Sequence, residues 1–457
     1  MYRSKKMNIK TVLLAIVLPA FTAFTQAQQV LTLPDALEYS LKASQAARKA
    51  KLEIENGTYR IDEVKSRALP QLNANGTLTY NPILQLTALP GEIVGMPGQT
   101  MMVAFGQKWN SGAVVSLSQT LFDQGVFTGL KAAKSTREYY QINADLTEEQ
   151  LIEQVAGNYY QVLVQRHKIA LIDSTIASTA KVQGIIKGQY DAGLARKIDI
   201  DRVAVNISNL QSSRQQLINT VMLYENQLKY AMGMPIQTAI QLPEVDFSSI
   251  RPRLVDAAET PDLGNRTELK LLNQQEKLLQ YQKESYRAEY YPSLSLSGNY
   301  GYQGLGNTFP MGKSGGSSGV NWFDHASAGV TLKVPLFNGF ATRSRIRQAD
   351  VAIRKFKEDV DQTKLSLDLQ FENAKTQIQN NLVILNNQKV NVNLAKEVFE
   401  HTQNNYNNGL APLTDLLDAE TSLTEANNNY AAALLDYKLA EIQLIKAKGE
   451  LRSLLKN

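Results

Sequence analysis

The chain has 457 residues, and at about 150 residues per domain this length would ordinarily indicate two or three domains. Lys and Arg number 48 against 43 Asp and Glu, but four basic residues lie in the first ten positions and the remainder balances at 44 to 43. This near-neutral body argues against a nucleic-acid binder, which would carry a basic face. The sequence contains no Cys, which excludes disulfides, thiolate zinc sites, Cys nucleophiles and a lipid-modified N-terminal Cys.

Residues 1–27 have the pattern of a secretory signal peptide. Basic residues up to Lys10 precede an apolar run from Thr11 to Phe24, and small residues close the segment at Ala27. A membrane anchor is the alternative, but Pro19 interrupts the run, which is shorter than the roughly 20 residues of a spanning helix. No later stretch approaches that length, so a mature chain that enters a membrane would need a closed β-barrel.

The rest of the chain contains two copies of one pattern. Tyr190-Asp-Ala-Gly-Leu-Ala recurs 216 positions later as Tyr406-Asn-Asn-Gly-Leu-Ala, and other segments recur in the same order. Four prolines punctuate the stretch between the copies, which cannot be one continuous helix. We therefore expect a first structural repeat at 28–234, a connector at 235–262 and a second structural repeat at 263–457.

Each copy contains two segments in which apolar and polar residues alternate with the period of a strand. The first copy has them at 71–80 and 115–121, and the second at 293–302 and 330–336. Their length of about ten residues suits a transmembrane β-strand, and aromatic residues lie at their ends. The alternative is an antiparallel sheet covered by helices, but the helical segments show no spare apolar face for one.

Four strands cannot close a membrane barrel, because the smallest bacterial barrels have eight. Three chains would supply twelve, so the pattern predicts a trimer with one shared barrel. The segments at about 81–112 and 303–327 are expected to be the extracellular connections between the strands.

Long helices follow each pair of strands. Val155, Val162, Ile169 and Ile176 are seven residues apart, and the spacing recurs from Phe371 in the second copy. A seven-residue repeat predicts coiled-coil packing. Each copy thus ends in a helical hairpin, and the roughly 65 residues from Gly125 to Tyr190 would span about 100 Å. Their wet faces suit twelve helices around a water-filled duct in a trimer.

A signal peptide, duplicated strand-turn-strand units, long hairpins and Tyr-x-x-Gly-Leu turns together resemble the TolC-like outer-membrane efflux proteins. The resemblance implies an α+β membrane protein, with four strands per chain in a shared 12-stranded β-barrel and a 12-helix α-barrel in a trimer. It further implies a passive exit duct of a tripartite efflux or type I secretion system. Its partners would be a homotrimer's other chains, outer-membrane lipid, a periplasmic adaptor protein and, through the adaptor, an inner-membrane transporter.

The resemblance places a gate at the periplasmic helical tip. Tyr406-Asn-Asn-Gly-Leu-Ala-Pro-Leu-Thr-Asp415-Leu-Leu-Asp418 matches the family's tip motif in its Tyr, its Gly and both Asp. In a trimer, Asp415 and Asp418 would form two carboxylate rings one helical turn apart, which would favour cations. The alternative is that both are solvated carboxylates near a helix start, where the helix dipole favours them.

One departure from the family affects the expected latch of the closed state. Ala411 stands where the family often has an Arg that ties neighbouring helices together. We expect Arg196 or Lys197 of the first-copy tip to pair with Asp415 or another tip carboxylate, and Asp199 to join that network.

Two further expectations concern the tips. Tyr406 is a candidate latch residue, although a plain coiled-coil packing role suits it better. The adaptor is expected to dock on the tips themselves, at Gly193, Leu194, Gly409 and Leu410.

Little in the sequence indicates an enzyme, a cofactor or a metal site. The three His residues share no ligand spacing. The segment Asn307-Thr-Phe-Pro-Met-Gly-Lys-Ser314 nearly fits a phosphate-binding loop, but Asn307 replaces its first Gly. The rival function is a non-channel periplasmic coiled-coil scaffold bridging envelope layers, which leaves the four strands unexplained.

Overall fold

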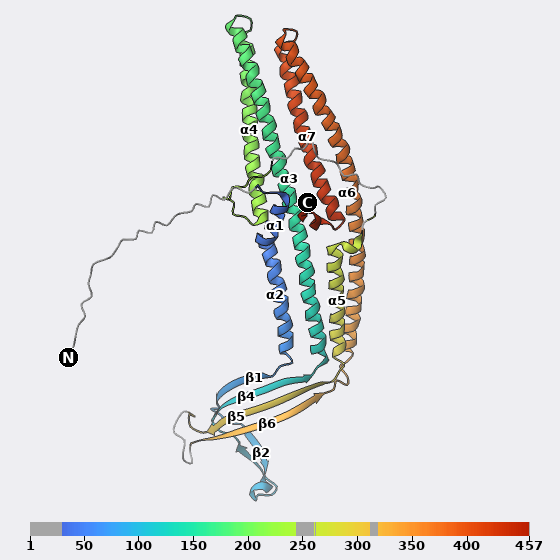
Figure 1. Ribbon diagram of the computed structural model, residues 1–457. Coiled ribbons are helices and arrows are strands. Elements are labelled where there is room, and N and C mark those ends of the chain that lie inside the picture. Colours follow the sequence, from blue (N-terminus) through green and yellow to red (C-terminus); the bar gives the residue numbers. More distant parts are fainter. Residues whose placement is uncertain (1–29, 244–259, 261, 311–318, 457) are drawn as a thin grey trace, which may run out of the picture.

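The computed structural model describes residues 30–243, 260, 262–310 and 319–456, and shows a long body of helices with a four-stranded sheet at its end (Figure 1). The expected signal peptide lies outside the described residues. So do positions 244–259 and 261 of the expected connector, and the end of the phosphate-loop-like segment after residue 310.

The four expected strands form one antiparallel sheet in the order β1-β4-β5-β6. Their bounds are β1 Gln71–Tyr80, β4 Trp109–Phe122, β5 Ser293–Gly306 and β6 Val320–Lys333. The last three have 14 residues each, so the connections are shorter than expected. One connection also contains a hairpin, formed by β2 (Leu86–Pro90) and β3 (Thr100–Ala104). The strands extend because the glycine-rich end of β5 stays paired, with Gly304 opposite Trp322 and Gly306 opposite Val320.

Pairing across the sheet separates apolar from polar side chains. One row contains Leu72, Leu117, Gly298 and Ala328 on successive strands. The adjacent row, on the opposite face, contains Asn73, Ser116, Asn299 and Ser327. Because side chains alternate along a strand, the apolar rows share one face and the amide and hydroxyl rows share the other.

Aromatic pairs mark the end of the apolar face that is farthest from the helices. Tyr80 and Trp109 lie opposite each other with ring centroids 4.5 Å apart, and Tyr302 stacks on Trp322 at 5.0 Å. The helices adjoin the sheet only at its other end (Figure 1). The interpretation of these strands as a sheet covered by helices is therefore wrong for the described chain.

Seven α-helices form the body of the described chain. They are α1 Leu33–Ala43, α2 Gln45–Ser66, α3 Gln124–Asp191, α4 Lys197–Met232, α5 Thr267–Ala288, α6 Ala341–Asn407 and α7 Leu413–Ala447. The 68 residues of α3 and the 67 of α6 correspond to about 100 Å each at 1.5 Å per residue. Both run the whole length of the body (Figure 1).

Each of the shorter helices α2, α4, α5 and α7 packs along one half of α3 or α6. Helices α2 and α5 lie beside the sheet-proximal halves of α3 and α6, and α4 and α7 lie beside the distal halves (Figure 1). Four helices per chain therefore occur at every level, as twelve per trimer require. Sequence reasoning recognised the distal hairpins but not that α2 and α5 continue them towards the sheet.

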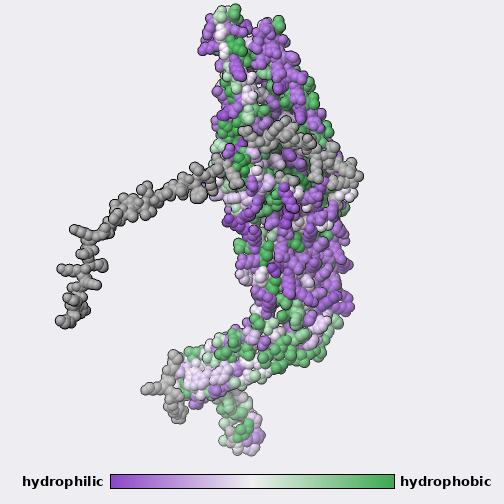
Figure 2. All heavy atoms as spheres, viewed as in Figure 1, coloured by the Kyte–Doolittle hydropathy of each residue, from purple (hydrophilic) through white to green (hydrophobic). Residues whose placement is uncertain are grey.

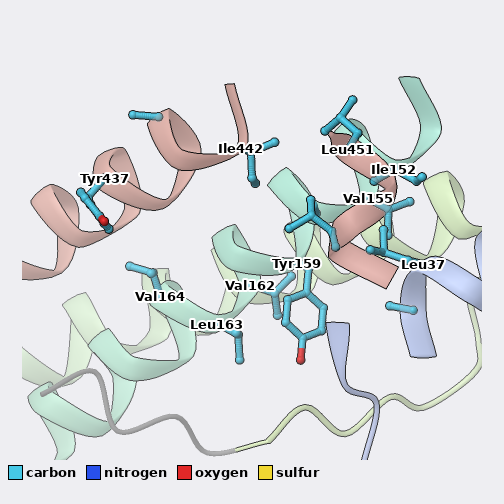
Figure 3. Close-up of a cluster of buried hydrophobic side chains, with 14 of the residues drawn as sticks. Leu37, Ile152, Val155, Tyr159, Val162, Leu163, Val164, Tyr437, Ile442 and Leu451 are labelled. Atoms are coloured by element: carbon cyan, nitrogen blue, oxygen red, sulfur yellow. The ribbon is translucent and has the colours of Figure 1, made fainter. Parts of the chain in front are cut away.

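The largest hydrophobic cluster lies at mid-length, where the two repeats meet (Figure 3). Val155 and Tyr159 of α3, Leu37 of α1 and Tyr437 of α7 are all at most 3% exposed. The Tyr159 hydroxyl donates a hydrogen bond to the Leu31 carbonyl oxygen at 3.0 Å. This cluster anchors both hairpins at their base and leaves their distal ends to separate contacts.

A buried arginine ties the start of the second repeat to its end. Arg266, 2% exposed, donates to the Ala447 carbonyl oxygen at 3.0 Å and to Glu268 at 2.7 Å. Burial alone would raise the pKa of Glu268. The Arg266 hydrogen bond, a backbone hydrogen bond and the nearby positive charges outweigh it and leave that pKa below its ordinary value.

The surface divides into two zones. Figure 2 shows hydrophobic residues gathered where the sheet meets the helices, and mostly hydrophilic residues over the helical body. Helix α3 does contain an 18-residue window of mean hydropathy 1.2, long and apolar enough to cross a membrane by composition. The expectation that nothing after the leader approaches such a length is wrong in that sense. Only 22% of that window is buried within one chain, although α3 as a whole contacts α2, α4, α5 and α7.

Candidate functional site

Both hairpins turn through the same local structure at their distal tips. In the first, the N–H of Leu194 donates to the Gln189 carbonyl oxygen at 2.8 Å, and Gly193 has a φ of +78°. In the second, the N–H of Leu410 donates to the Asn405 carbonyl oxygen at 2.8 Å, and Gly409 has a φ of +72°. This is the Schellman helix ending, which needs a left-handed residue and so favours Gly. The recurring Gly is thus a structural requirement of the turn.

The leucines after these glycines project into solvent. Leu194 is 83% exposed and Leu410 77% exposed, so each tip presents an unshielded apolar side chain at its extreme end. A solitary exposed leucine is ordinary, but both lie at the end of the molecule farthest from the sheet (Figure 1).

A small hydrophobic cluster joins the two tips, separate from the one at mid-length. Ile186 of α3, Val203 of α4 and Leu416 of α7 are each at most 1% exposed, and Val182 and Leu413 complete the buried set. These residues come from both repeats. The tips of one chain are therefore packed against each other and do not stand apart.

Tyr406 packs against this tip cluster from α6. Its hydroxyl also donates a hydrogen bond to the Gln189 side-chain oxygen at 3.5 Å, which crosses to the first repeat. Burial, and then the nearby Asp199 charge, raise the pKa of Tyr406 further above its ordinary value. Packing is its main contact within one chain, and the long hydrogen bond is an addition to it.

The two aspartates of the expected gate lie on the first turns of α7. Asp415 and Asp418 are both exposed, and their spacing of three places them on neighbouring positions of one helix face. The Thr414 hydroxyl donates to Asp415 at 3.4 Å. Exposure at a helix N-terminus is also the ordinary setting of a solvated carboxylate.

Arg196 pairs with Asp199 inside its own turn. The Arg196 Nε donates to the Asp199 carboxylate at 3.4 Å, and the Arg196 backbone N–H donates to the same oxygen at 3.4 Å. The Asp199 side chain is 18% exposed, while that of Arg196 is 81% exposed. Lys197 begins α4 and is exposed. In one chain, then, the carboxylate that Arg196 contacts is Asp199 and not Asp415.

Sequence reasoning missed a buried polar link just behind the two aspartates of the expected gate. Glu420 of α7 is 6% exposed and lies between the two repeats. It contacts the Thr179 hydroxyl of α3 at very short range and accepts a hydrogen bond from the Asn206 side-chain amide of α4 at 3.0 Å. Burial raises the pKa of Glu420, and the two hydrogen bonds oppose that shift.

A signal for this link was present in the sequence. Leu413, Glu420, Asn427 and Leu434 are seven residues apart on α7, and the two leucines are buried. A carboxylate in a seam whose ends are apolar indicates a buried polar contact, as polar residues at core positions of coiled coils do. The partners could not be found this way, because the register between α7 and α3 is a tertiary property.

Among the described residues, no group of three or more His, Asp or Glu side chains could hold a metal ion. Asn307 of the phosphate-loop-like segment directly follows β5, and the next described element is a strand, β6. A phosphate-binding loop opens a helix instead.

Comparison with known proteins gives consistent results. The profile of a family described as "Outer membrane efflux protein" matches residues 36–234 and 262–450. The outer membrane protein TolC of Escherichia coli K12 is 20% identical over 452 residues, which cover 96% of this chain and 86% of that protein. TolC of Vibrio cholerae is 23% identical over 344 residues, which cover 74% of this chain and 76% of that protein.

Solved structures share the fold at low sequence identity. The CusC crystal structure aligns with a TM-score of 0.70 and 15% identity over 92% of each chain. The open state of the MtrE outer membrane channel of Neisseria gonorrhoeae aligns with a TM-score of 0.68 and 18% identity, covering 92% of this chain and 90% of that one. The two matched segments of the family profile fall on the two structural repeats and cover well over half of the sequence, so this chain belongs to the outer membrane efflux protein family.

Proposed function

We propose that the protein is the trimeric, passive exit duct of a tripartite efflux or type I secretion system, gated at its periplasmic tips. It is an outer-membrane efflux channel whose helices lie in the periplasm, as membership of the family implies. The adaptor protein and the inner-membrane transporter with which it would work supply both the energy and the choice of cargo.

One observation carries the proposal: an uncovered four-stranded sheet with an apolar and a polar face is joined end-on to helices about 100 Å long. Within the described part of one chain, the outer edges of β1 and β6 are unpaired. In a membrane, unpaired backbone groups are too costly to leave exposed, so the edges must pair with other copies. Three copies give twelve strands, with the apolar face towards outer-membrane lipid and the amide and hydroxyl face towards the lumen.

The soluble scaffold does not fit this sheet. Leu72, Leu78, Val330 and Leu332 are 54–70% exposed on strands that no helix covers. A periplasmic scaffold would present this apolar face to water, whereas a lipid-facing barrel needs it.

The gate is proposed at Asp415 and Asp418. Their exposure in one chain and their position on the same helix face at the tip support two rings of three carboxylates around a threefold axis. A constriction with six negative charges would favour cations.

The adaptor-docking tips are proposed as Gly193, Leu194, Gly409 and Leu410, whose turns share one geometry and whose leucines are exposed. An adaptor could cover these leucines without disturbing the tip cluster beneath them.

The tip latch is proposed to involve Arg196, Lys197, Asp199 and Tyr406. The Arg196 side chain is 81% exposed and is free to turn towards a neighbouring chain's carboxylate, because its own contact with Asp199 is long at 3.4 Å. An exposed ion pair of this kind contributes about 0–1 kcal/mol, which suits a latch that must open.

The proposed boundaries are a signal peptide at 1–27, repeats at 28–234 and 263–457, and a periplasmic connector at 235–262. The end of α4 at Met232 and the start of α5 at Thr267 support the two inner boundaries.

The test is single-channel recording of the detergent-extracted protein in a planar bilayer under a salt gradient. The proposal predicts conducting steps with a reversal potential that indicates cation selectivity. Substitution of both aspartates, Asp415→Asn with Asp418→Asn, should weaken that selectivity, while Glu425→Gln, an exposed carboxylate of the same helix, should not. Inserted protein that never conducts would overturn the duct, and unchanged selectivity in the double variant would move the gate elsewhere.

A further inference from the structure

The link at Glu420 joins three helices at one point behind the tips. Glu420 extends from α7, and its two carboxyl oxygens meet Thr179 of α3 and Asn206 of α4. Glu420 and Thr179 belong to different repeats and lie 241 positions apart in the sequence. Glu420 lies five residues after Asp415 on α7, so whatever holds Glu420 also holds the base of the proposed gate.

The hydrogen bonds around Thr179 decide which form of Glu420 fits the site. The Thr179 hydroxyl lies 2.8 Å from the Thr175 carbonyl oxygen, which can only accept, and it also contacts the Glu420 carboxyl. A hydroxyl has one hydrogen to donate. If Thr179 donates to Thr175, the proton between Thr179 and Glu420 must come from Glu420. The neutral acid then satisfies every group, because its other oxygen accepts from Asn206.

The contacts that stabilise the link come from neutral groups. On α3, Asp173 is paired with Arg214 of α4, and Lys181 is exposed. On α4, Asp201 and Arg202 are also exposed. None of these side chains is among the contacts that act on Glu420, which are its burial and the two hydrogen bonds.

The second repeat likewise brings its charges to the surface here. Asp418 and Glu425 of α7 are exposed, and on α6, which packs along α7, Lys396 pairs with Glu400 at 3.8 Å with both side chains more than half exposed. A buried carboxylate without a cation is costly, whereas a buried neutral acid with two hydrogen bonds is not.

A cavity of about 300 Å³ lies next to the link, and its wall combines hydroxyl and amide groups with apolar side chains. It lies between α3, α4 and α7, and Thr175 and Thr424, one turn from Thr179 and Glu420 respectively, are in its wall. Its charged residue, Lys168, lies eleven residues before Thr179 on α3, about 16 Å along the helix.

We propose that Glu420 is a protonation-controlled link between the two hairpins of each chain. As a neutral acid it holds α7 against α3 and α4, and as a carboxylate it favours their separation and with it the opening of the tip. Burial decides the direction of the pH dependence, because it raises the pKa of Glu420 above its ordinary value of 4.5. The stabilisation that protonated Glu420 gives to the contact of α7 with α3 and α4 is complete below pH 4.5. It is lost as the pH rises through the raised pKa of Glu420.

The first test observes the proton directly, by infrared titration of the full-length, detergent-extracted protein. Wild type minus Glu420→Gln should show the carbonyl band of a protonated carboxylic acid whose titration midpoint lies above pH 4.5, and Glu425→Gln should retain it. The amide of Glu420→Gln is isosteric and can replace both hydrogen bonds, so this variant should fold. A Glu420 band that disappears by pH 4.5 would overturn the proposal.

The second test asks whether the proton controls opening, and this part rests on the proposed channel function. With both gate aspartates replaced by Asn, so that they do not titrate, the ratio of open to closed channels should rise with pH. The total rise should be about tenfold for each unit by which the pKa of Glu420 is raised. Adding Glu420→Gln should abolish the rise, and adding Glu420→Ala should give a high open probability at every pH. A pH dependence that survives Glu420→Gln would overturn the link. If no variant conducts, the duct itself fails, and the infrared titration alone decides the protonation of Glu420.

Discussion

Leu416→Ala tests whether the tip cluster holds the hairpins together. Leu416 of α7 is 1% exposed and packs in the cluster that contains Val182, Ile186 and Val203 of the first repeat. Truncation of a buried leucine to alanine costs about 2–5 kcal/mol, because the apolar contacts are lost and a cavity remains. The cost falls on the contact between the repeats near the tip and leaves the separate cluster at mid-length intact.

The magnitude can be read from amide hydrogen exchange in the first turns of α7. A loss of 2–5 kcal/mol in the free energy of local opening corresponds to exchange about 30-fold to a few thousand-fold faster, at about 1.4 kcal/mol per factor of ten. Amides near Val155, in the mid-length cluster, should exchange at their wild-type rates.

Leu410→Ala is the matched control, since Leu410 is 77% exposed at the same tip. An exposed leucine of this kind contributes within about 0.5 kcal/mol, so its variant should change exchange by no more than about twofold. Less than threefold acceleration by Leu416→Ala, or equal acceleration by both variants, would refute the view that the cluster fastens the tips.

Three further predictions follow from local geometry. Gly409→Ala should destabilise the second tip by about 1–2 kcal/mol, because Gly409 has a positive φ. Gly184→Ala, inside α3 with open space around it, should be neutral or stabilising, and thermal unfolding would compare the two variants. Glu268→Gln should reduce the loss of unfolding free energy at acidic pH. The lowered pKa of Glu268 stabilises the fold above pH 4.5, and that contribution is lost as the pH falls through the lowered value; chemical denaturation between pH 3 and 7 would measure it. Gly304→Ala should displace the Trp322 ring, which lies 2.7 Å from the position of the new Cβ, and weaken the barrel by about 1–3 kcal/mol, seen as earlier heat dissociation and altered Trp fluorescence.

The strands and long helices could be predicted because their periods are local properties. The alternation from Gln71 to Tyr80 and the seven-residue spacing from Val155 identified β1 and α3, and both elements exist with those residues. Each pattern reports which face is apolar, and this is decided within a few neighbouring residues.

The ends of the strands and the packing partners of the helices were harder to predict from the sequence. Gly304 and Gly306 gave no alternation signal, yet they remain in the sheet because Trp322 and Val320 lie opposite them. Likewise, α2 and α5 complete the α-barrel only through their packing on α3 and α6, a tertiary contact that no local pattern shows.

The candidate site shows the same division. The Gly-Leu turns, with Gly193 and Gly409, could be predicted because the helix ending itself requires them. The Glu420 contact could not, because it depends on how two repeats more than two hundred residues apart align. The residue was visible in its heptad, but its partners were not.

The most direct measurement of the central claim is a cryo-electron microscopy structure of the full-length protein in lipid nanodiscs. The account predicts a threefold assembly in which β6 of one chain pairs with β1 of the next to close twelve strands. Asp415 and Asp418 of the three chains should converge around the axis at the far end of a continuous lumen. A monomer, or a trimer whose aspartates point away from the axis, would contradict it.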